Sequence, residues 1–61
     1  MFKVCFYVKS DNQHQIFHNV VKMYDLFDRY CIICGYKKNR HIYYVDYNNY
    51  KLKWIMIDER S

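Results

Sequence analysis

The chain has 61 residues, three cysteines and a formal net charge of +4 at pH 7. A chain this short buries only about 60% of the surface that its unfolded form exposes, so we expect one domain, residues 1–61, with a thin folding margin. The odd cysteine count disfavours a disulfide framework, and no run approaches the roughly 18 apolar residues of a membrane span. We therefore expect a cytoplasmic protein with free thiols.

The first segment, residues 2–9, alternates with a period of two and predicts a strand. Its even positions are apolar and should face the core: Phe2, Val4, Phe6 and Val8. Its odd positions should lie on the other face: Lys3, Cys5, Tyr7 and Lys9.

The next segment, residues 13–30, predicts an amphipathic helix. Ser10 and Gln13 have the spacing of a capping box, in which two side chains satisfy free amides at the start of a helix. The apolar residues that follow recur mostly at intervals of three or four, as on one face of a helix. They are Ile16, Phe17, Val20, Val21, Met23, Tyr24 and Phe27.

Three β-rich segments follow, at residues 31–37, 40–47 and 50–58. The joints Lys38-Asn39 and Asn48-Asn49 suit tight hairpins, because Asn tolerates the left-handed backbone conformation that such turns require. The expected fold class is therefore α+β, in the order β-α-β-β-β. One amphipathic helix packs on one face of a four-stranded, mostly antiparallel sheet, and the other face stays open.

The open face and the basic turn carry the predicted partner-binding residues. A two-residue turn at Lys38-Asn39 would pair Cys34 with Tyr43 and place Ile33, Ile42 and Tyr44 on the open face. In the last strand we expect Leu52, Trp54 and Met56 to point inward. The ten predicted partner-binding residues are Lys3, Tyr7, Lys9, Lys37, Lys38, Arg40, Tyr44, Lys51, Lys53 and Ile55.

Two histidines and two cysteines have the spacing of a zinc finger in reverse order: His14, His18, Cys31 and Cys34. On the expected helix, thirteen steps of 1.5 Å would place Cys31 about 20 Å from His18, far beyond the reach of a shared zinc ion. Cys31 and Cys34 would also point to opposite faces of a strand. We therefore expect no metal and no cofactor at these residues.

The sequence favours an interaction protein over an enzyme. A single glycine excludes a phosphate-cradling loop, and so short a chain offers no cleft that would exclude water from a Cys–His pair. Residues with AT-rich codons dominate the composition, which favours a phage or another mobile element as the source. The expected function is to bind and inhibit or modulate a host protein in the host cytoplasm.

Two alternatives stay open. The first is binding of single-stranded nucleic acid by Tyr and Lys side chains on the open sheet face, which suits the basic charge. The second is a structural homo-oligomer, such as a homodimer, that closes the same face.

Overall fold

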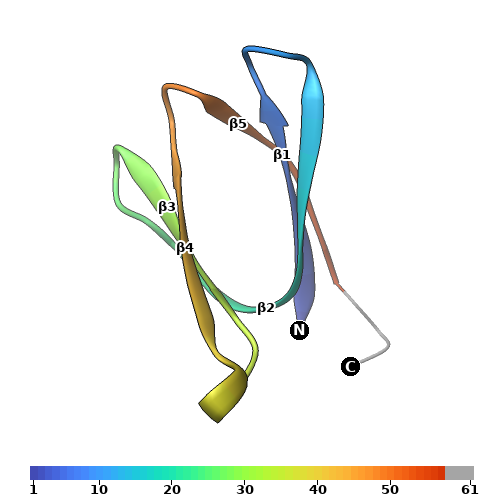
Figure 1. The fold of residues 1–61 in the computed structure, drawn as a ribbon, viewed down its shortest axis with the longest axis vertical. Helices are drawn as coiled ribbons and strands as arrows, with labels where there is room; N and C mark the ends of the chain where they lie inside the picture. The colour runs from blue at the N-terminus through green and yellow to red at the C-terminus, as the bar shows by residue number, and fades with distance from the viewer. Residues whose placement is uncertain (58–61) are drawn as a thin grey trace.

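The computed structural model describes residues 1–57, which form a sheet of five antiparallel strands (Figure 1). The elements are β1 (Phe2–Val8), β2 (Gln13–Asp25), β3 (Arg29–Cys34), the short 3-10 helix η1 (Lys37–Asn39), β4 (His41–Asp46) and β5 (Tyr50–Ile57). The order in the sheet is β4-β3-β2-β1-β5. The α+β prediction is therefore wrong. The predicted end of the last strand at Asp58 lies outside the described residues.

The segment predicted as a helix forms β2, the turn after it and the start of β3. Its composition disfavours a helix, because aromatic and β-branched residues such as Ile16, Phe17 and Val20 lose rotamer freedom there and pack better on a sheet. The predicted capping box is the turn between β1 and β2. The Gln13 amide donates to Asp11 Oδ1 at 3.2 Å, and Asn12 takes a left-handed φ of 59°. Side chains that cap helices also stabilise turns.

Two irregularities in β2 explain the helix-like spacing. Phe17 and Val20 pair with Val4 and Phe2 of β1, so two residues of β2 oppose one residue of β1. Val20 and Met23 pair with Cys34 and Ile32 of β3 across a second register shift. Each bulge inserts one residue into the strand. Inward side chains therefore recur every three residues, which imitates one face of a helix.

The bulges also bend β2, so that its two halves belong to two layers (Figure 1). The first layer consists of β5, β1 and residues 13–17 of β2; the second consists of residues 20–25 of β2, β3 and β4. Aromatic rings join the layers. Phe6 lies 5.5 Å from Tyr30, and Phe17 lies 5.2 Å from Tyr43, measured between ring centroids.

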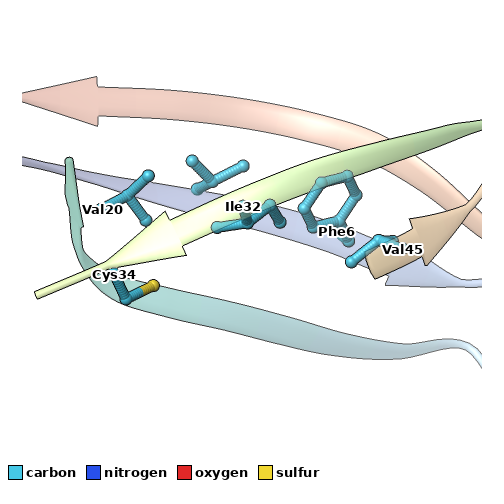
Figure 2. Close-up of a cluster of buried hydrophobic side chains, with 6 residues drawn as sticks. Phe6, Val20, Ile32, Cys34 and Val45 are labelled. Atoms are coloured by element: carbon cyan, nitrogen blue, oxygen red, sulfur yellow. The ribbon is translucent and has the colours of Figure 1, made fainter. Parts of the chain in front are cut away.

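The hydrophobic core lies between these layers and draws on four strands (Figure 2). Val4, Phe6, Val20 and Ile32 are fully buried, and Cys34 and Val45 complete the cluster. Val4 and Phe6 confirm the predicted inward face of the first strand. No helix among residues 1–57 has the length and apolar character needed to cross a membrane.

The connection between β3 and β4 is longer than the two-residue turn predicted. Gly35 takes a φ of 79°, η1 follows, and Cys34 pairs with His41 instead of Tyr43. The true register differs from the predicted one by two residues, which leaves every side chain on the same face. Ile33, Ile42 and Tyr44 therefore share one face of the sheet, as predicted.

The inward face of β5 was predicted correctly only in its first half. Trp54 pairs with Cys5 whereas Leu52 pairs with Phe6, so Lys53 is an extra residue at a bulge. Leu52 points inward as expected. Beyond the bulge the alternation is reversed: Trp54 and Met56 point outward, while Ile55 and Ile57 lie on the inner side.

Candidate interaction surfaces

The side of the first layer that points away from the core is basic and aromatic. Lys51 of β5, Tyr7 of β1 and His14 of β2 form one cross-strand row. Lys3 pairs with Met56 on the same side. We call this surface the basic outer face, and it comprises Lys3, Tyr7, His14, Lys51, Lys53 and Trp54.

A contact across β1 holds two residues of the basic outer face together. Lys53 Nζ lies 2.8 Å from His14 Nε2, so the Lys53 side chain reaches from β5 over β1 to β2. An ammonium group can only donate hydrogen bonds, so in this contact Lys53 donates and His14 Nε2 accepts. The Tyr7 ring lies edge-on to the His14 ring, with centroids 5.7 Å apart.

The side of the second layer that points away from the core is largely apolar. Tyr24, Cys31 and Tyr44 form one cross-strand row, and Lys22, Ile33 and Ile42 form the next. We call these six residues the apolar outer face. Ile42 and Tyr44 are 53% and 62% exposed, and Tyr24 is 46% exposed. The two outer faces lie on opposite sides of the core, because the core separates the layers.

The structure divides the ten predicted partner-binding residues. It brings Lys3, Tyr7, Lys51 and Lys53 together on the basic outer face and places Tyr44 on the apolar one. The others lie elsewhere. Lys9 donates to the Tyr47 carbonyl at 3.0 Å, Lys37, Lys38 and Arg40 lie at η1, and Ile55 is at an open apolar end beside Phe2.

Two residues of the basic outer face, His14 and Trp54, were not among the predicted partner-binding residues. Because residues 13–30 were predicted to form a helix, the row of His14 with Tyr7 was not foreseen. Trp54 was assigned to the core because strict alternation from Leu52 points it inward. Lys53 between Leu52 and Trp54 also fits ordinary alternation, so the local sequence does not mark the bulge.

The zinc-like spacing does not assemble into a site. Among residues 1–57, no three His, Cys, Asp or Glu side chains group closely enough to hold a metal ion. The helix argument against zinc was wrong, because β2 is a strand. Cys31 and Cys34 do face opposite sides, since Cys31 pairs with Tyr44 on the apolar outer face and Cys34 belongs to the core.

The four carboxylates of the described part lie in or beside turns, where each has a partner of its own. Asp28 pairs with Arg29 at 2.9 Å, and this hydrogen bond lowers the pKa of Asp28 and raises the pKa of Arg29. Asp46 accepts from the Asn49 amide, and Asp25 accepts from the Tyr47 hydroxyl. Asp11 accepts from the Gln13 amide. Among residues 1–57, therefore, no carboxylate forms a salt bridge with a lysine of the basic outer face.

Comparisons of the chain with models of protein families, with curated proteins and with solved structures found no match. The two outer faces therefore have to be interpreted from their own chemistry.

Proposed function

We propose that the protein is a small, non-catalytic interaction protein that binds a host protein through the apolar outer face and thereby inhibits or modulates it. One observation carries the proposal: the second layer presents two cross-strand rows rich in exposed Ile and Tyr side chains on the side opposite its core. The excess of residues with AT-rich codons favours a phage or mobile-element source, and a protein from such a source would act on a host protein.

The chemistry of this surface suits contact with a protein. Contiguous apolar patches on small proteins commonly mark interaction sites. Tyr is enriched at the centre of protein interfaces, where its ring supplies buried area and its hydroxyl a hydrogen bond. Lys22 stands at the end of one row, where an interface usually becomes polar. Removal of the Ile33 and Ile42 side chains from water is favourable in a protein interface, whereas these side chains offer no interaction to a phosphate backbone.

A non-catalytic role agrees with the titratable groups. Among residues 1–57, the pKa departs from its ordinary value at Asp28, Arg29 and Cys34. The first two shift because they are paired with each other, and the third because it is buried. None of these causes joins a nucleophile to a base, which is the arrangement that catalytic sites use.

The proposal is tested by capture from nuclease-treated host lysate. The wild-type protein is compared with Ile42→Glu, which places a charge in the apolar outer face, and with Ile57→Glu, which makes the same change at the 78%-exposed end of β5. We expect the wild type and Ile57→Glu to retain a stoichiometric partner and Ile42→Glu to lose it. Circular dichroism verifies that both variants keep the sheet.

Three results would contradict the proposal. Capture that survives Ile42→Glu unchanged would place the contact elsewhere. A partner captured only from a parallel lysate without nuclease would indicate contact through nucleic acid. A tight homodimer in light scattering that captures nothing would favour the structural homo-oligomer.

A further inference from the structure

The basic outer face concentrates positive charge on one side of the molecule without a carboxylate among the residues that define it. Lys51 and Lys53 come from β5, and Lys3 comes from the adjacent strand β1. Lys51 pairs with Tyr7 of β1, and Tyr7 is four residues from Lys3 along this strand. Four residues correspond to about 13 Å at 3.3 Å per residue. The charges therefore follow a line along the strands.

An aromatic and apolar platform lies between these charges. Trp54, Cys5 and Ile16 form a cross-strand row next to the Lys51, Tyr7 and His14 row. Trp54 is half-buried, and Cys5 is only 1% exposed although it belongs to the outward side of β1. Neighbouring side chains therefore cover Cys5, so the platform is closely packed at its centre.

Local contacts hold the side chains of this platform in place. The Tyr7 hydroxyl donates to Asn12 Oδ1 in the adjoining turn, which anchors one end of the ring. The contact between Lys53 and His14 holds an ammonium group above β1. A surface whose side chains are already ordered loses less conformational entropy when a ligand binds.

From this arrangement we infer that the basic outer face binds single-stranded nucleic acid. Phosphates contact Lys3, Lys51 and Lys53, and unpaired bases stack on Trp54 and Tyr7. Stacking on aromatic rings needs bases whose faces are free, as they are in a single strand and are not inside a duplex. An acidic protein segment would pair with the lysines, but its carboxylates would not stack on the aromatic rings of Trp54 and Tyr7. This activity goes beyond the proposed protein contact and lies on the opposite side of the core.

The test uses a fluorescein-labelled oligothymidylate of roughly 20 nucleotides, which exceeds the usual footprint of one small domain. Trp54 is the single tryptophan of the chain, so its fluorescence reports directly on the platform. We expect quenching of Trp54 on binding. Three phosphate contacts at about 0.7 each predict that log K falls with log salt with a slope of about −2.

Two double variants with the same change in net charge locate the site. Lys51→Glu with Lys53→Glu should weaken binding more than tenfold and remove most of the salt dependence. Lys37→Glu with Lys38→Glu, at η1, should retain most of the affinity. Trp54→Ala should weaken binding, measured by fluorescein anisotropy, by about 5- to 150-fold, because stacking contributes about 1–3 kcal/mol per base. Trp54→Phe keeps an aromatic ring and should recover most of this loss.

The inference is overturned by any of four results. These are absence of quenching, equal losses in the two double variants, tighter binding of a duplex of the same length, and displacement of the oligonucleotide by polyglutamate at equal charge concentration. The last result would indicate an acidic protein partner. The Ile42→Glu variant of the apolar outer face should bind the oligonucleotide normally, so failure of the two proposals is distinguishable.

Discussion

The ring of Phe6 in β1 packs against the ring of Tyr30 in β3, with centroids 5.5 Å apart and planes tilted by 49°. The two strands are not neighbours in the sheet, so this contact exists only because β2 bends and brings the two layers face to face. Phe6 also packs against Phe17 of its own layer, with the ring centroids 5.9 Å apart. Because Phe17 in turn lies 5.2 Å from Tyr43 of the second layer, these two rings join the layers.

Truncation of Phe6 should come close to unfolding the protein. Phe6 is fully buried, so Phe6→Ala removes apolar contacts from both layers and should cost about 3–5 kcal/mol. A domain of this size has only about 3–9 kcal/mol in total, at 0.05–0.15 kcal/mol per residue. Urea unfolding followed by circular dichroism measures the loss. Phe27→Ala, at an 89%-exposed position, should change stability by less than about 0.5 kcal/mol, and equal losses would contradict the two-layer core.

Gly35 should resist substitution, because its backbone has a left-handed φ of 79° and an added Cβ would lie 2.4 Å from the Asn39 carbonyl oxygen. Gly35→Ala should therefore destabilise the turn before β4 by about 1–3 kcal/mol. Gly35→Asn meets the same carbonyl but tolerates the left-handed conformation better, so its loss should be smaller. Thermal unfolding of the three proteins compares them. An Ala variant as stable as the wild type would show that the turn rearranges freely.

Phe27 occupies a left-handed backbone position that would suit glycine better. It has a φ of 74° in the turn between β2 and β3, where a bulky residue is strained. Phe27→Gly should stabilise the protein by about 1 kcal/mol relative to Phe27→Ala, because Gly adopts this conformation without a steric penalty. The Phe27 amide donates to Asp25 Oδ1 at 2.9 Å, and this bond is available to either variant. Chemical denaturation of the two variants measures the difference, and a more stable Ala variant would refute the argument.

Cys34 should make the protein less stable in alkali. Burial raises the pKa of its thiol in the folded state, whereas the unfolded thiol keeps an ordinary pKa of about 8.5. The stabilisation of the folded state by the protonated Cys34 thiol is complete below the pKa of the unfolded state. It is lost as the pH rises through the folded pKa, because the unfolded state releases its proton first. Unfolding free energies of wild type and Cys34→Ala, measured between about pH 8 and 10, should therefore converge as the pH rises. Cys31→Ala serves as the comparison, and parallel pH profiles for the wild type and Cys34→Ala would contradict the assignment.

Much of the outward surface was predictable from local patterns. Alternation in residues 2–8 places Val4 and Phe6 in the core and Lys3 and Tyr7 outside, because successive strand side chains point to opposite faces. The shared face of Ile42 and Tyr44 was also predictable, since a register error of two residues preserves it.

The conformation of residues 13–25 and the orientation of Trp54 could not be predicted from the local sequence pattern. Whether residues 13–25 form a helix or a strand is decided by hydrogen bonds to β1 and β3, the strands before and after this segment, and not by its own pattern. Bulges beside Val20 and at Lys53 then shift the alternation by one residue each. The two bulges in β2 disguised a strand as a helix, and the bulge at Lys53 moved Trp54 from the expected core to the basic outer face.

The sequence by itself determined the polarity of the first strand, the turns rich in Asn and Asp and the excess of Lys and Tyr, because these follow from side-chain chemistry and from steric preferences of single residues. Only the tertiary structure decided which side chains stand together. The row of Lys51, Tyr7 and His14 joins three strands across one sheet, and the row of Tyr24, Cys31 and Tyr44 joins three strands on the opposite side of the core. Such rows arise from pairing between distant segments, whose register is set by packing of the whole core.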